Sequence, residues 1–253
     1  MTDFSQEALE IASALGGLTY VIGALIYALP IPFRGLKDWG PTLMGDGIYV
    51  AFWTAFYSAI EGLMSTVETD LGVTWKHFLS FIDSNLSTVA LLFITVSTAS
   101  ALLQKFFINY APLTMLSLGL STLTLVLVAV KTLGYLVKEN WSILVVIGIM
   151  LMAIPFRIAR SAGATLISFS ITFYTGLPVM VDFLNLIQFS LPNNSIIDKL
   201  NPAYPIIHTM PTIFAIILSI MAYIGILTAI AADLADTIGG YRGRLPFGIE
   251  VVL

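Results

Sequence analysis

Long apolar stretches, separated by short polar segments, run along almost the whole chain. A helix needs roughly 20 apolar residues to cross the hydrocarbon core of a bilayer. Backbone groups inside that core must be satisfied within the segment, and the stretches lack the alternation of barrel strands, so helices are favoured. We predict an all-α fold with about seven transmembrane helices, at residues 11–29, 47–67, 86–104, 113–130, 141–156, 162–183 and 211–232.

The sixth predicted helix contains Gly176 and Pro178. Proline has no backbone N–H and clashes with the preceding turn, so it kinks or breaks a helix. We therefore predict a kink or break at these two residues. Asp182 follows near the end of the same helix, where an interfacial position is expected. Together with Glu61, it is a candidate functional polar residue within the predicted spans.

The composition sets the class of protein. Of 253 residues, 58% are hydrophobic and only 10% are charged, whereas a soluble protein carries about 25% charged residues. This chain cannot cover a water-soluble surface, and we predict a single transmembrane domain over residues 1–253 in the cell membrane. The residue pattern also predicts an interfacial external loop at 68–85, with a short amphipathic helix that places Trp75 at headgroup depth, and a cytoplasmic tail at 237–253.

Recognisable catalytic and cofactor-binding motifs are missing from the sequence. It contains no cysteine, and His77 and His208 do not have metal-ligand spacing, so we predict no metal and no cofactor. H-E-x-x-H, Walker and G-x-S-x-G motifs are absent. The segment Gly45-Asp46-Gly47 only faintly suggests an aspartyl intramembrane protease. We predict that the protein is not an enzyme.

Lysine and arginine indicate the orientation, because cytoplasmic loops carry an excess of these residues. One side holds seven cations: Arg34, Lys37, Lys105, Arg157, Arg160, Arg242 and Arg244. The other side holds four: Lys76, Lys131, Lys138 and Lys199. The N-terminus is therefore expected outside and the C-terminus in the cytoplasm.

One sequence element occurs twice. The segment "IPFRGLKDWGPTL" at residues 31–43 is echoed by "IPFRIARSAGATL" at residues 154–166, and each follows a Val-Ile-Gly. Four predicted spans separate the copies, so both would face the same side of the membrane. This pattern predicts a parallel internal repeat, with units at about 11–67 and 141–184, as is common in transport proteins.

The repeated element places two cations in each copy, Arg34 and Lys37 in the first and Arg157 and Arg160 in the second. Cations at a cytoplasmic membrane edge are normally topology signals that contact lipid headgroups. Alternatively, the four would form a basic ring at one membrane depth, at the inner mouth of a passage, and would attract a polyanion or an acidic motor surface. Both interpretations remain open on the sequence.

Glu61 lies inside the second predicted span. A carboxylate at mid-membrane costs roughly 2.5–3.5 kcal/mol on insertion scales, and such residues mark ion or proton sites. The alternative function is therefore a secondary transporter or ion channel for a small solute that uses Glu61. The ordinary explanation is that Glu61 is wet or bonded to a neighbouring hydroxyl.

The segment "IMLMAIPFRIARSAGATLISFSITFYTGLPVMVDFL" at residues 149–184, together with its echo at residue 31, resembles the CedA family. CedA proteins are the polytopic membrane components of crenarchaeal Ced DNA-import systems and are similar to TrbL-type conjugation channel subunits. The resemblance implies a pore or scaffold subunit of an archaeal DNA-translocating machine, with no catalytic residues to carry over.

The same resemblance implies the partners. A separate HerA-type ATPase would supply energy, small two-helix membrane subunits would join the complex, and DNA would be the cargo. Membrane lipid surrounds the chain in either functional interpretation, and the sequence allows a homo-oligomer.

Overall fold

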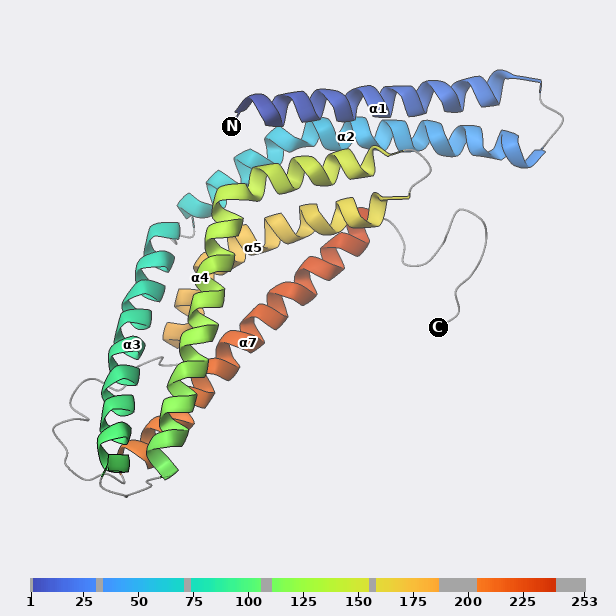
Figure 1. Ribbon diagram of the computed structural model, residues 1–253. Helices are drawn as coiled ribbons and strands as arrows, with labels where there is room; N and C mark the ends of the chain where they lie inside the picture. Colours follow the sequence, from blue (N-terminus) through green and yellow to red (C-terminus); the bar gives the residue numbers. More distant parts are fainter. Residues whose placement is uncertain are drawn as a thin grey trace. The chain divides into compact units, whose positions relative to one another are not determined.

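A computed structural model describes residues 2–30, 34–70, 74–105, 111–154, 158–186 and 204–239 (Figure 1). These residues form six helices, which are α1 (Thr2–Ala28), α2 (Arg34–Asp70), α3 (Trp75–Lys105), α4 (Ala111–Met152), α5 (Arg160–Leu186) and α7 (Tyr204–Gly239). Five of them, all except α2, are long and apolar enough to cross a membrane. The described part of the chain therefore supports a polytopic helical membrane protein.

The predicted count of seven spans is not supported, because the fourth and fifth lie in one helix. Helix α4 runs without interruption through residues 131–140, which we had expected to be an external loop. Lys131 pairs with Asp83 of α3, Nζ to Oδ1 2.6 Å, and Gly134 lets the Phe78 ring approach the helix closely. No proline interrupts this segment, and Lys, Leu and Glu are good helix formers. Polar residues alone had suggested the loop.

The residues expected to form an interfacial helix around Trp75 also differ from the prediction. Trp75 begins the long helix α3, and Trp75, Phe78 and Ile82 are all buried. The Trp75 and Phe78 rings meet edge to face, with centroids 5.6 Å apart. Their helical spacing reflects a packed helix face and not a surface that lies on headgroups. Residues 71–73 of this segment lie outside the described residues.

Helix α5 is not broken at Gly176 and Pro178, because it continues through both to Leu186. A proline leaves carbonyl groups of the preceding turn without their usual donor. The Tyr223 hydroxyl of α7 donates a hydrogen bond to the Gly176 carbonyl, 2.7 Å, which joins α7 to α5 two residues before the proline. A kink at Pro178 stays a prediction.

The chain divides into two compact units. Unit 1 holds residues 1–71, 137–175 and 227–253, and unit 2 holds residues 72–136 and 176–226. The divisions fall inside α4, α5 and α7, so each of these helices contributes to both units. The buried residues of unit 2 include one face of α3 and a row of leucines on α4, at positions 116, 120, 123 and 127.

Helices α1 and α2 form a closely packed antiparallel hairpin in unit 1. Two glycine pairs mark its contact line. A Cβ added at Gly23 would lie 2.7 Å from the Gly40 carbonyl oxygen, and a Cβ added at Gly47 would lie 2.6 Å from the Gly16 carbonyl oxygen. Side chains cannot fit at such distances, so the two backbones touch, as small residues permit between membrane helices. On the other face of α1, Leu18, Val21 and Leu25 are exposed.

The α4–α5 hairpin of unit 1 has the same kind of contact. A Cβ added at Gly148 would lie 2.7 Å from the Gly163 carbonyl oxygen. Gly23 and Gly148 are the last residues of the two Val-Ile-Gly triplets, and Gly40 and Gly163 occupy matching positions after the two Pro-Phe-Arg elements. The two copies of the sequence element therefore place equivalent glycines at equivalent helix crossings.

Candidate functional site

The helix ends that flank the two Pro-Phe-Arg segments lie together at one end of unit 1. The end of α1, the start of α2, the end of α4 and the start of α5 all lie at that end (Figure 1). Side-chain contacts within unit 1 support the same arrangement of the helix ends. Tyr57 of α2 meets Ser142 of α4, and Asp46 of α2 meets Arg160 of α5. Moving along α2 from Tyr57 to Asp46 thus leads from the middle of unit 1 toward the α4–α5 connection.

The starts of α2 and α5 lie at different levels along α2, however. Arg160, at the start of α5, is level with Asp46, whereas Arg34 and Lys37 precede Asp46 on α2. A helix rises about 1.5 Å per residue, which puts Lys37 about 14 Å and the Arg34 backbone about 18 Å beyond Asp46. A shared membrane depth for these cations and Arg160 stays a prediction. Helix α2 therefore begins well beyond the level of Arg160.

Arg160 forms an ion pair with Asp46, with Nη1 and Oδ1 3.1 Å apart. Both side chains are largely buried, 16% and 15% exposed. The guanidinium carbon also lies 4.0 Å from the centre of the Tyr49 ring, where a cation is attracted to the ring face. Arg160 is the first residue of α5, so the Asp46 carboxylate is also close to a helix N-terminus, which favours an anion.

The ion pair belongs to a contact that joins three helices. The Tyr49 hydroxyl donates a hydrogen bond to the Ile238 carbonyl near the end of α7. Trp53, one turn further along α2, meets the Tyr49 ring edge to face at 6.2 Å. A cluster of buried residues from α1, α2, α4, α5 and α7 surrounds these groups. Residues 46, 49 and 53 thus form one face of α2 that holds α5 and α7.

The four predicted inner-mouth cations therefore have different surroundings. Arg160 is engaged within the protein and is not a free cation at a mouth. Lys37 is exposed, with Nζ 5.9 Å from the centre of the Tyr27 ring. Arg34 begins α2, and Arg157 lies outside the described residues. A polyanion contact remains a prediction for these last three.

Glu61 lines a cavity of about 330 Å³ in unit 1. Helices α1, α2 and α4 all contribute to it, and Glu139 is a second carboxylate on its wall. Tyr57 and Ser142 share a hydrogen bond of 2.6 Å at this cavity. Glu61 itself is exposed in the protein structure.

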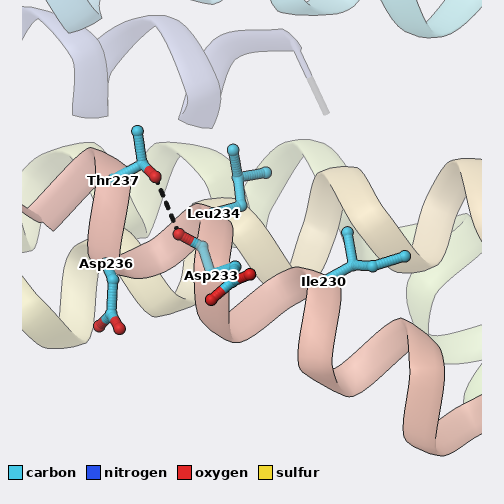
Figure 2. A pocket seen from close by; sticks show the side chains of 5 residues that line it. All are labelled: Ile230, Asp233, Leu234, Asp236 and Thr237. Carbon is cyan, nitrogen blue, oxygen red and sulfur yellow. Dashed lines mark hydrogen bonds between the residues drawn. The ribbon is translucent and has the colours of Figure 1, made fainter.

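Three further aspartates, Asp182, Asp233 and Asp236, are distant in sequence from the Glu61 cavity and from the Asp46–Arg160 ion pair. Asp182 is an exposed residue of α5 in unit 2. Asp233 and Asp236 lie on exposed positions of α7 beside an open hollow of about 600 Å³ (Figure 2). The Thr237 hydroxyl donates to the Asp233 carbonyl at 2.9 Å, within the helix itself (Figure 2). Among the described residues, no group of three or more His, Asp or Glu could hold a metal ion.

Sequence reasoning missed the role of Asp46. The residue drew attention only through the Gly-Asp-Gly segment and a protease comparison. A usable signal was present, since charges inside apolar segments usually pair with one another, and Asp46 and Arg160 each lie in an apolar part of the chain. Their distance in sequence hid the pairing.

The fold and the site together define a class of protein. Several apolar helices, closely packed through glycines and an internal ion pair, form a polytopic α-helical membrane protein. A family model described as DNA import protein CedA1 matches residues 1–69, which cover nearly all of the α1–α2 hairpin.

The "DNA import protein CedA" of Sulfolobus acidocaldarius is 33% identical to this chain over 252 residues, covering 94% of this chain and 95% of the relative. The chain therefore belongs to the CedA family. No solved structure matches it.

Proposed function

We propose that this chain is a membrane-embedded subunit of a DNA import apparatus and acts as a pore or scaffold component without enzymatic activity. The observation that carries the proposal is the match to the DNA import protein CedA along 94% of the chain. Because that match covers nearly the whole chain, we favour DNA import over a small-solute transporter that uses Glu61. Energy would come from a separate ATPase, and small two-helix membrane subunits would be further partners.

We also propose that the two hairpins are copies of one ancestral unit. Supporting this, both carry the Pro-Phe-Arg element in their connection and both cross at matching glycines, Gly23 with Gly40 and Gly148 with Gly163. Each hairpin would project its connection, and the cations in it, toward the cytoplasm. The N-terminus of the chain would then lie outside.

In this proposal the cations of the connections have two roles. Arg34, Lys37 and Arg157 contact DNA phosphates or the acidic surface of a motor, because they lie in or next to the two connections. Arg160 instead anchors the second connection to α2 through Asp46. The exposed position of Lys37 and the engaged position of Arg160 support this division.

The test is DNA transfer in cells that carry Arg34→Ala together with Arg157→Ala. We expect transfer to fall about tenfold or more, since a hydrogen bond to a charged group contributes about 1.5–3 kcal/mol. The matched control is Lys76→Ala with Lys138→Ala, which removes two cations from the predicted opposite side and should leave transfer unchanged. In both variants the protein level must stay normal, and tags placed at the two chain ends must keep their normal accessibility. If the variant with Arg34→Ala and Arg157→Ala transfers DNA normally, these two cations serve only as topology signals.

A further inference from the structure

The cavity that contains Glu61 lies within unit 1. Its volume of about 330 Å³ lies in the range of roughly 300–1,000 Å³ that small-molecule sites occupy. Three separate helices build it. Its walls are Ser5, Gln6 and Leu9 of α1, Tyr57 and Glu61 of α2, and Glu139, Trp141, Ser142 and Ile143 of α4.

Contacts inside the protein hold parts of the wall in place. The Tyr57 hydroxyl and Ser142 Oγ are 2.6 Å apart and tie α2 to α4. The Trp141 ring packs against Tyr174 of α5, with centroids 5.3 Å apart and planes tilted by 52°. Two aromatic residues of the cavity are therefore fixed before any ligand arrives, which lowers the entropy cost of binding.

The charge on the wall is negative. Glu61 and Glu139 contribute two carboxylates, and the lining residues include no cation. Lys138 lies 3.9 Å from Glu139, Nζ to Oε1, but both side chains are well exposed, so this pair is weak. A cationic ligand would be attracted to the cavity.

The wall is better suited to an organic cation than to a metal ion. The described residues hold no group of three metal-ligating side chains, and the cavity is much larger than a bare ion. Its other polar groups, the Gln6 amide oxygen and the hydroxyls of Ser5, Ser142 and Tyr57, accept hydrogen bonds. An ammonium with N–H donors can use these acceptors, whereas a quaternary ammonium cannot. The Trp141 ring offers an aromatic surface to a cation.

We propose that this cavity binds an aliphatic primary ammonium group, either of a free amine or of a lysine side chain on a partner. Glu61 and Glu139 supply the charge, the hydroxyls and Gln6 accept N–H groups, and Trp141 and Leu9 cover the aliphatic chain. The inference does not depend on a role in DNA import, because it rests on the wall of the cavity alone.

The test is a titration of the full chain in lipid nanodiscs with n-butylammonium chloride, followed by saturation-transfer-difference NMR. Empty nanodiscs give the blank, and potassium chloride keeps the ionic strength constant. We expect saturable binding that Glu61→Gln and Glu139→Gln each weaken by about three- to fivefold, as for partly exposed ion pairs. Tetramethylammonium, which has no N–H donor, should bind more weakly than n-butylammonium.

Glu10→Gln is the matched control, because Glu10 is an exposed carboxylate of α1 that does not line the cavity. It should leave the affinity unchanged. Equal weakening by Glu10→Gln, equal binding of tetramethylammonium, or absence of saturable binding would overturn the proposal. N-acetyl-lysine amide distinguishes the two sources. If it binds like n-butylammonium, the ligand is a lysine side chain, and if only n-butylammonium binds, the ligand is a free amine.

Discussion

Arg160 and Lys37 occupy the same place in the two copies of the Pro-Phe-Arg element but have different surroundings. Arg160 meets Asp46 and the Tyr49 ring inside unit 1, whereas Lys37 is exposed near Tyr27. The reason is that α2 passes the α4–α5 connection and presents Asp46 to it. A side chain's role in a repeated motif therefore depends on which helix passes beside that copy.

At the same scale we predict a large loss of stability when the ion pair is broken. Asp46→Asn should lower the free energy of unfolding in detergent by about 3–5 kcal/mol, because it leaves the Arg160 charge buried without compensation. Asp38→Asn, an exposed carboxylate two turns earlier on α2, should change it little. The double variant Asp46→Leu with Arg160→Met should be more stable than Asp46→Asn. If the double variant is less stable than Asp46→Asn, the pair contributes through something other than charge compensation.

At the scale of elements, the helix hairpins rest on backbone contact at glycines. Gly40→Ala would put a Cβ 2.9 Å from the Gly23 carbonyl oxygen, and Gly148→Ala would put one 2.7 Å from the Gly163 carbonyl oxygen. Both carbonyl oxygens belong to the backbone, so a whole helix must shift. We expect each variant to lose about 1–3 kcal/mol of stability, as in other overpacked sites.

Gly45→Ala is the control for this prediction, since a Cβ there has no neighbour within 4 Å. Alanine is a better helix former than glycine by about 1 kcal/mol, so Gly45→Ala should be neutral or stabilising. Thermal unfolding in detergent measures all three variants. Similar losses at Gly45 and Gly40 would mean that the loss at Gly40 does not come from contact between the two helices.

For the whole molecule, the positions of the chain ends within unit 1 bear on topology. Ser5 and Gln6 lie with Glu61 and Tyr57 of α2 at the cavity, while Ile238 meets Tyr49. Tyr49 and Glu61 are about 18 Å apart along α2, at about 1.5 Å per residue. The start of α1 and the end of α7 are thus at different levels of the unit.

We therefore expect the two chain ends to lie on opposite sides of the membrane. A tag at the N-terminus should react with an impermeant reagent in intact cells, and a tag at the C-terminus should react only after permeabilisation. A cytoplasmic protein serves as the control for cell integrity. Labelling of both tags in intact cells would contradict the expectation that the two ends lie on opposite sides.

The sequence by itself determined the class of protein, most helix positions and the repeated element. Long apolar stretches have one stable form in a bilayer, because a helix satisfies its backbone internally, and this rule needs no knowledge of neighbours. The glycines of the two hairpins could be identified in the same way, since small residues at helix crossings are a local signal.

Only the tertiary structure decided which polar residues meet. Residues 131–140 contain the charges of a loop, yet they continue α4 because Asp83 and Phe78 of another helix accommodate Lys131 and Gly134. Asp46 and Arg160 are far apart in the chain, and the ion pair forms because two hairpins pack side by side. Such pairings depend on contacts between distant segments, which hydrophobic pattern and charge counts do not encode.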